Sequence, residues 1–246
     1  MKALYSLGQY LLLLKQVFKP PENKKIYLKR IIVEIDRLGL DSLGIVMIIS
    51  IFMGAVLCIQ LAFNIDHPLV PLYTIGYAVR ESVVLEFSPT IISLILAGKV
   101  GSLIASEIGT MRITEQIDAL EIMGINPAAF LIFPKIVASV LINPVLIVIS
   151  MFLAVFGAWL AGITTGLVPT HIFVLGIQSF FVPFNIFYAL IKTAVFAFLI
   201  ASISGYYGFY TKGGALEVGT ASTKGVVMSS IMIIVFNLIL TQLFLT

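Results

Sequence analysis

The chain has 246 residues, of which 60% are hydrophobic and 11% are Asp, Glu, Lys or Arg, and its mean hydropathy is +1.11. This charged share is about half of what soluble domains carry, which excludes a soluble globular protein of this size. A single cysteine excludes an internal disulfide, and two histidines are too few for a structural metal site.

The first 40 residues are expected to lie on the membrane surface. Apolar residues recur there at three- and four-residue steps, at Leu4, Leu7, Leu11, Leu14 and Phe18. A helix lying in the interface fits this stripe, with Pro20 and Pro21 ending it and a second amphipathic piece following over residues 28–38. The alternative is an extramembrane helix packed on a partner. We therefore divide the chain into an interfacial segment, 1–40, and a membrane-spanning domain, 41–246.

Uncharged runs predict five spans, because about 20 apolar residues cross the hydrocarbon core as a helix. The run between Asp41 and Asp66 and the run after Lys224 each predict one span. The run 136–191 is too long for one crossing, so it predicts a span over about 130–157, a loop, and the start of a span over 184–206. The fifth span, 82–106, is interrupted by charges, but it carries small residues at four-residue steps that let helices approach closely. These are Ala97, Gly101, Ala105 and Gly109, with Gly98, Ser102 and Ser106 beside them.

Basic residues set the expected orientation, since Lys and Arg accumulate on the cytoplasmic side of membrane proteins. Eight of the 15 basic residues precede Asp41, and only Arg80 falls clearly on the other side of the predicted spans. This distribution predicts a cytoplasmic N-terminus. Five spans then place the C-terminus outside.

Motifs for common enzymatic chemistry are missing from the sequence. It has no G-x-x-x-x-G-K-[ST], so the chain is not expected to hydrolyse ATP by itself. G-x-S-x-G, H-E-x-x-H and C-x-x-C are missing as well, which leaves an enzyme without a reactive group.

The segment GTMRITEQIDALEIMGINP, residues 109–127, is polar and lies between two predicted spans on the cytoplasmic side. Thr114 is expected to cap a short helix, which Gly124 and the Asn126-Pro127 pair end. The helix has an acidic face beside an apolar edge, formed by Glu115, Asp118 and Glu121 and by Ile117, Leu120 and Met123. Such a helix is suited to a groove on another protein. The alternative is an ordinary solvated loop.

The run SPTIISLILAGKVGSLIASEIGTMRITEQIDALEIMGINP, residues 88–127, resembles the signature region of the MlaE (YrbE-type) permeases. The stretch GGALEVGTASTKGVVMSS, residues 213–230, resembles the second block of that family, and the likeness extends from about Leu40 to the C-terminus. These permeases are membrane subunits of ABC transporters that move phospholipids or other lipids together with MCE-domain proteins. One departure is Leu85, where family members often have an arginine, so a role that rests on that arginine is not carried over.

The resemblance implies an all-α membrane protein with an interfacial helix, five spans and a short coupling helix seated in a cytoplasmic ATPase. The coupling residues would be Glu115, Gln116, Ile117, Asp118, Ala119, Leu120 and Glu121. It also implies a second copy of this chain, an ABC ATPase dimer, an MCE-domain lipid-binding protein and phospholipid as partners, with no nucleic acid. The location would be the bacterial inner membrane. ATP and Mg would be bound by the ATPase, and this chain would hold no cofactor or metal.

Charges at membrane depth are the candidates for the lipid pathway, namely Glu86, Lys99 and Lys192. The lysines could instead extend to the membrane surface or pair within the bundle, and Glu86 could have a structural partner such as Arg80 or the backbone near Pro89. The sequence therefore predicts a lipid permease without an ATPase site of its own. A polytopic lipid-modifying enzyme and a non-transport scaffold are the alternatives.

Overall fold

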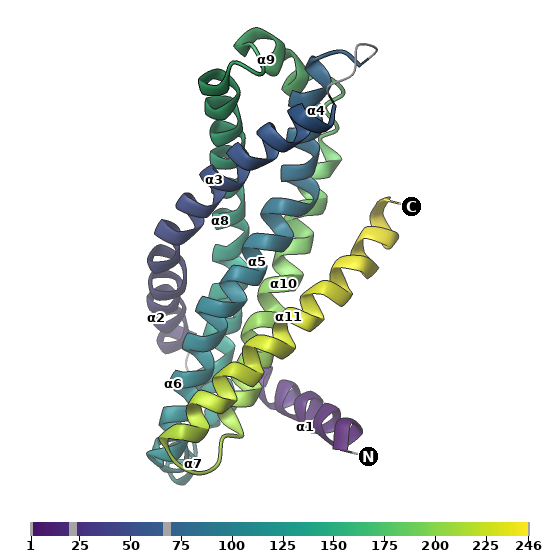
Figure 1. Ribbon diagram of the computed structural model, residues 1–246. Helices are drawn as coiled ribbons and strands as arrows, with labels where there is room; N and C mark the ends of the chain where they lie inside the picture. Colours follow the sequence, from purple (N-terminus) through teal and green to yellow (C-terminus); the bar gives the residue numbers. More distant parts are fainter. Residues whose placement is uncertain (1, 20–23, 66–69, 246) are drawn as a thin grey trace. The chain divides into compact units, whose positions relative to one another are not determined.

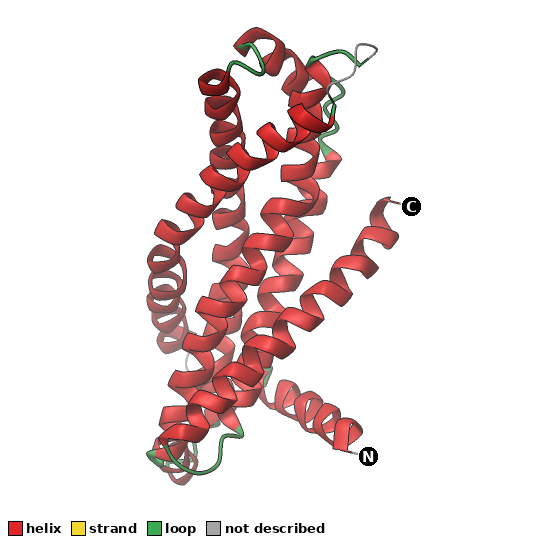
Figure 2. Cartoon of the chain, viewed as in Figure 1, coloured by secondary structure: helices red, strands yellow, loops and turns green. Residues whose placement is uncertain are grey.

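The computed structural model describes residues 2–19, 24–65 and 70–245, and the regular structure in these ranges is helical (Figures 1 and 2). Pro20, Pro21, Asp66 and His67 lie outside the described residues. Within these ranges, five helical stretches are long and apolar enough to cross a membrane, which confirms the predicted number of spans. They are Lys24–Asn64, Tyr73–Ile113, Pro127–Thr165, Phe184–Phe209 and Ala215–Phe244.

The described chain begins with two helices and the first span, which are α1 (Lys2–Val17), α2 (Lys24–Ile35), the π-helical turn η1 (Asp36–Leu40) and α3 (Asp41–Asn64). The second span and the segment after it are α4 (Tyr73–Ser82), η2 (Val83–Ile91), α5 (Ile92–Leu96), η3 (Ala97–Gly101), α6 (Ser102–Ile113) and α7 (Gln116–Ile122). The remaining helices are α8 (Pro127–Thr165), α9 (Thr170–Gln178), α10 (Phe184–Phe209) and α11 (Ala215–Leu245).

The predicted interfacial segment is helical, and its second piece runs without a break through η1 into the first span. The predicted stripe is largely exposed, at Leu4, Leu7 and Leu11 of α1 and at Phe18 directly after it, whereas Leu13 and Val17 of α1 are buried. An exposed apolar stripe is what a helix lying in the membrane interface requires. The division at residue 40 stays a prediction.

The second span is longer than predicted and contains two π-helical stretches, η2 and η3. Proline lacks the backbone N–H that an α-helix uses in its interior. Pro89 lies inside η2, where the wider turn lets the helix continue past it. The effect of Pro89 is therefore a local change in helical geometry, and the helix continues on both sides of it.

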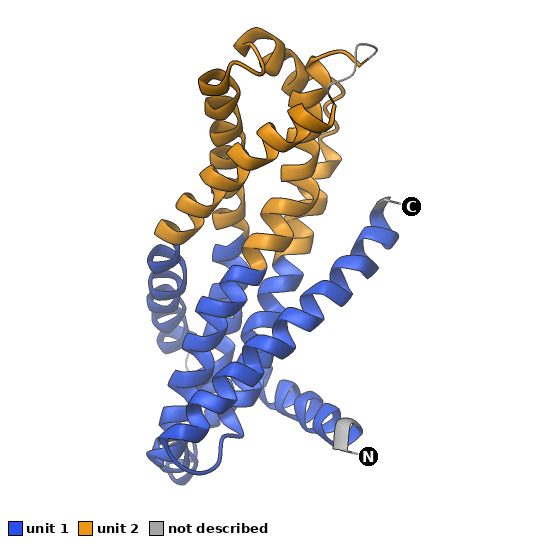
Figure 3. Cartoon of the chain, viewed as in Figure 1, with its two compact units in different colours: residues 1–42, 94–143, 194–246 blue, residues 43–93, 144–193 orange. Residues whose placement is uncertain are grey.

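The described chain forms two compact units, coloured in Figure 3. Unit 1 comprises residues 1–42, 94–143 and 194–246, and unit 2 comprises residues 43–93 and 144–193.

In unit 2, glycines bring helix backbones into direct contact. Gly54 of α3 lies against the backbone of Ala154 in α8, and Gly157 of α8 lies against the backbone of Ile51 in α3. A serine chain ties the same helices to η2, because the Ser50 hydroxyl donates to Ser150 Oγ (2.9 Å) and Ser150 Oγ donates to Ser88 Oγ (3.0 Å). Close backbones and interhelical hydroxyl bonds are the means by which helices associate in lipid.

In unit 1, the predicted row of small residues on η3 and α6 is the packing face. Ala97, Gly101, Ala105 and Gly109 are all buried. Gly101 packs on Ser204 of α10, and Gly109 packs on Val218 of α11. By contrast, Gly98 of the neighbouring row faces open space. The α1 helix is attached to this unit through Tyr10, whose hydroxyl shares a 2.8 Å hydrogen bond with Ser202 Oγ. Burial raises the pKa of Tyr10, so the hydroxyl is neutral in this contact.

Candidate functional site

Two of the three predicted lipid-pathway residues form an ion pair in unit 2. Lys192 of α10 lies 2.8 Å from Glu86 Oε1 of η2, and its ammonium also donates to the carbonyl of Leu85 at 3.0 Å. The hydroxyl of Thr90 donates to the other carboxylate oxygen, Glu86 Oε2, at 3.0 Å. The sequence left open that Lys192 pairs within the bundle, but it did not predict Glu86 as the partner.

The pair is strongly asymmetric in its exposure. Lys192 is 0% exposed, whereas the side chain of Glu86 is 44% exposed. Lys192 lies about 12 Å from the start of α10, a helix about 39 Å long, so the ammonium lies within the depth of the hydrocarbon core. The buried Lys192 therefore binds the carboxylate of Glu86, which is accessible on the surface of the chain at membrane depth.

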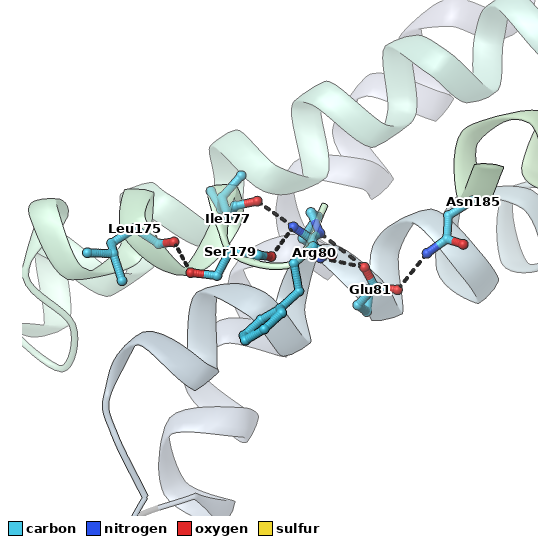
Figure 4. A network of polar contacts seen from close by, with 7 residues as sticks. Arg80, Glu81, Leu175, Ile177, Ser179 and Asn185 are labelled. Atoms are coloured by element: carbon cyan, nitrogen blue, oxygen red, sulfur yellow. Dashed lines mark hydrogen bonds and ion pairs between the residues drawn. The ribbon is translucent and has the colours of Figure 1, made fainter. Parts of the chain in front are cut away.

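Arg80, which was considered as a structural partner of Glu86, has other partners. It is 4% exposed and contacts Glu81 at 2.6 Å (Figure 4). Its guanidinium also donates to the carbonyl of Ile177 in α9 (2.6 Å) and to the carbonyls of Ser179 (2.8 Å) and Phe180 (3.2 Å) after α9. The proposed Arg80–Glu86 pair is thus wrong, because the guanidinium serves to close the turn between α9 and α10.

This turn contains a residue in a left-handed backbone conformation. Phe180 has φ of 52°, which is rare for a residue with a side chain. The carbonyl bonds to Arg80 hold it in place, and Asn185 at the start of α10 donates to Glu81 Oε2 at 3.0 Å (Figure 4). Sequence reasoning considered Arg80 as a loop charge and as a partner of Glu86, and the neighbouring Glu81 was the available signal for the pair that the structure contains.

Lys99, the third lipid-pathway candidate, lies in unit 1. Its ammonium donates to the backbone carbonyl of Asp41. It lines a cavity of about 380 Å³, together with Arg37 and Asp41 and the serines Ser42, Ser102, Ser106 and Ser222. Two cations and several hydroxyls form a lining that can hold a phosphate-bearing headgroup.

The predicted coupling helix is present as α7, but it begins differently than expected. Thr114 belongs to the end of α6, where its hydroxyl donates to the carbonyl of Thr110 at 2.8 Å, so the prediction that it caps α7 is wrong. Glu115 is the residue before α7 and has φ of 59°. Two consecutive helices meet here with a sharp reversal, which a left-handed residue provides. Gly124, with φ of 78°, ends the helix as predicted.

The faces of α7 also differ from the predicted pattern. Ile117 is buried and anchors the helix, and Asp118 pairs with Arg112 at 2.7 Å. The exposed apolar residues are Ile122, which is 88% exposed, and Met123, which is 64% exposed. Sequence reasoning missed Ile122, because it does not share the three-residue spacing used to define the apolar edge.

Unit 1 contains an ionic cluster that was not predicted. Lys135 of α8 is 2% exposed and contacts Glu34 of α2 at 2.6 Å and Glu107 of α6 at 2.9 Å. Arg37 also contacts Glu107, at 2.8 Å. The isolated Lys135 at the start of a long uncharged run was a signal, but its partners come from distant parts of the chain. We call Glu34, Arg37, Glu107 and Lys135 the Lys135 cluster.

Within the described ranges, no group of three or more His, Cys, Asp or Glu side chains is arranged to hold a metal ion. The chemistry that these sites offer is recognition of charged and polar groups by fixed lysine, arginine, carboxylate and hydroxyl side chains.

Comparison with known proteins finds relatives along nearly the whole chain. The family model described as Permease MlaE matches residues 31–243. A probable ABC transporter permease protein of Rickettsia prowazekii (strain Madrid E) is 35% identical over 236 residues, which cover 94% of this chain and 87% of that protein. A probable ABC transporter permease protein of Synechocystis sp. is 33% identical over 228 residues, with 93% and 86% covered. The chloroplastic protein TRIGALACTOSYLDIACYLGLYCEROL 1 of Arabidopsis thaliana is 32% identical over 220 residues, with 89% and 63% covered.

Proposed function

The chain belongs to the MlaE permease family and is a multi-pass membrane permease subunit, and from this premise we propose that it moves phospholipid or a related lipid. The lipid would pass between the membrane and an MCE-domain partner. The relative from Arabidopsis thaliana is named after a glycolipid, trigalactosyldiacylglycerol, which supports a lipid cargo.

The observation that carries this proposal is the ion pair between Lys192 and Glu86. Ionisable groups at membrane depth are costly, so they mark pathways for polar groups more often than they serve packing alone. The exposed carboxylate and the buried ammonium would form the polar wall along which a lipid headgroup travels. Lys99 and the cavity that it lines in unit 1 are a further candidate for contact with a lipid headgroup.

A second copy of the chain is part of the proposal. A carboxylate exposed to lipid tails would be costly, so the exposed side of Glu86 is expected to face a cavity that another protein surface closes. The α11 helix also lacks cover, since only 11% of its apolar window is buried. These two features favour a homodimer in which lipid binds between the copies.

ATP hydrolysis by a separate ABC ATPase dimer, which would bind ATP and Mg, is proposed to drive the transport. The α7 helix is its proposed contact, through residues 115–121 together with the exposed Ile122. The N-terminus and α7 would then be cytoplasmic, the C-terminus would lie outside, and the membrane would be a bacterial inner membrane. This orientation follows from the basic N-terminal segment.

Reconstitution tests the proposal. The permease is placed in liposomes with its ATPase and MCE-domain partner, and transfer of a labelled phospholipid is measured with ATP and without it. The expected result is ATP-dependent transfer of lipid that mass spectrometry recovers chemically unchanged. Chemically altered lipid would favour a lipid-modifying enzyme, and no transfer with an intact complex would contradict the lipid cargo.

A further inference from the structure

A cavity of about 430 Å³ lies beside the Lys135 cluster in unit 1. Its polar lining comes from α2, η1, α6 and α8, and consists of Lys29, Arg30, Glu34, Arg37, Glu107 and Lys135. All of these residues lie toward the ends of their spans. Residues 29–37 precede the uncharged run that begins after Asp41, Glu107 is close to the end of the second span at Ile113, and Lys135 is close to the start of the third span at Pro127. The cavity therefore lies at one membrane surface, the one that α7 also adjoins in the chain.

The charges of this lining are unbalanced. Four cations face two carboxylates. Lys135 pairs with Glu34 Oε1 and, together with Arg37, with Glu107 Oε2, while the buried Glu34 Oε2 has no hydrogen-bond partner among the described residues. Lys29 and Arg30 form no ion pair with any residue in the described ranges. Arg30 is instead fixed by the ring of Phe130, 3.7 Å from its guanidinium carbon, and by the Phe130 carbonyl at 2.9 Å. The cavity thus presents an oriented guanidinium and a free ammonium, which suit a phosphate group.

The same cavity is also lined by apolar residues. Along α2 and into η1, Ile26 and Val33 alternate with Lys29 and Arg37 at three- and four-residue steps, so one helix face carries both kinds of side chain into the lining. Ile26 and Val33 are each about half exposed, and Met111 of α6 lines the cavity as well. A soluble anion would leave these apolar groups in water, whereas a lipid would cover them with its acyl chain.

We propose that this cavity binds the phosphate headgroup of an anionic glycerophospholipid from the adjoining leaflet, as a site separate from the Glu86–Lys192 pathway. Basic pockets at the ends of membrane helices bind anionic headgroups in this way. The lipid would join α2 to the two spans that flank α7, because the lining residues belong to those three helices. Its binding would therefore stabilise the end of the permease that carries α7.

Binding can be measured on the purified chain alone, in detergent, by native mass spectrometry and thermal unfolding. The probes are phosphatidylglycerol and phosphatidylcholine with the same acyl chains. The expected result is one tightly held phosphatidylglycerol and a raised unfolding temperature, with weaker retention of phosphatidylcholine. Lys29→Gln is expected to weaken phosphatidylglycerol binding about five-fold and Lys29→Glu about thirty-fold.

The matched control is Lys24, an exposed cation of the same helix that does not line the cavity. Lys24→Gln and Lys24→Glu should leave the tight site unchanged. Equal losses in the Lys24 and Lys29 variants would overturn the site in favour of diffuse surface charge, as would full retention in Lys29→Glu. If inorganic phosphate stabilises the chain as well as phosphatidylglycerol does, a soluble-anion site replaces the lipid site. Because neither ATPase nor MCE partner is present, this outcome is independent of the transport test.

Discussion

Lys135 in unit 1 and Lys192 in unit 2 are both buried lysines in membrane helices, yet their surroundings differ. Lys135 is held by two carboxylates from two other helices. Lys192 is held by one carboxylate and lies within the core depth of its helix. The first lysine is fully neutralised and ties helices together.

The second lysine leaves a carboxylate accessible at membrane depth. Its partner, Glu86, has close to half of its side chain exposed, whereas Glu34 and Glu107 at Lys135 are largely buried. The comparison suggests that a buried lysine acts as a structural tie where its partners are covered. Where the carboxylate partner is exposed, as at Lys192, the pair can bind the polar headgroup of a transported lipid.

Removing Lys135 is expected to have the largest effect. Lys135→Met leaves Glu34 and Glu107 buried around an apolar side chain, and loss of one partner from a buried ionic group costs about 3–5 kcal/mol. We expect the variant to unfold at a lower temperature in detergent and to accumulate poorly in membranes. Lys24→Met, at an exposed position, is the control and should behave like the wild type. Normal stability of Lys135→Met would remove the distinction between the two lysines.

Reversing the charges at the start of α7 is expected to weaken association with the ATPase while the permease still folds. Glu115 is exposed and Asp118 is partly exposed, so the double variant Glu115→Lys with Asp118→Lys should still insert into the membrane. Loss of charge pairs at an interface costs roughly 2–5 kcal/mol, so co-purification of the ATPase should fall sharply. Ile122→Asp should have a similar effect, because it removes the most exposed apolar side chain of the segment. Unchanged ATPase association and turnover in both variants would exclude α7 as the contact.

Lys192→Met is expected to reduce transport by about ten-fold or more, the equivalent of about 1.4 kcal/mol, while the fold persists. The fold persists because Glu86 keeps its bond from Thr90 and its exposed side. The measurement is lipid transfer in liposomes, with lipid crosslinking as a second readout. If the variant transports lipid and crosslinks to it as the wild type does, Lys192 has only a structural role through its contacts with Glu86 and the Leu85 carbonyl.

Two glycines of η3 give the smallest expected effects, and these have opposite signs. A Cβ at Gly101 would lie 2.8 Å from Ser204 Oγ, whereas Gly98 has open space around it. Gly101→Ala should therefore cost roughly 1 kcal/mol in stability, and Gly98→Ala should be neutral or slightly stabilising because alanine favours helix. Thermal unfolding of both variants in detergent provides the measurement. A loss of stability in Gly98→Ala would show that the row of Gly98, Ser102 and Ser106 packs against a second copy of the chain.

Much of the fold follows from local patterns in the sequence. Uncharged runs are long enough to count the spans, and the glycine, asparagine and proline after residue 123 are sufficient to end α7. The start of α7 could not be predicted in the same way. Thr114 is a favourable N-cap by residue type, but α7 begins one residue later because Glu115 adopts a left-handed conformation, which the sequence pattern does not reveal.

The candidate sites were predictable as residues and unpredictable as pairs. Glu86 and Lys192 stand out because each is a charge in an apolar run, but their partnership depends on how distant segments of the chain pack. The contacts of Lys135 with Glu34 and Glu107 likewise depend on the packing of distant segments and could not be predicted. Periodicity reports which face of a helix is apolar, and it carries no information about which other helix meets that face.

The central claim, that Glu86 is an open carboxylate serving lipid passage, is tested most directly by Glu86→Ala. Complex assembly and lipid transfer are measured in the same preparation of permease, ATPase and MCE partner. We predict intact assembly with strongly impaired transfer, since the exposed carboxylate is removed and Lys192 keeps the Leu85 carbonyl as a partner. Loss of assembly together with transfer would contradict the claim and make Glu86 a structural residue. Normal transfer with intact assembly would exclude both roles.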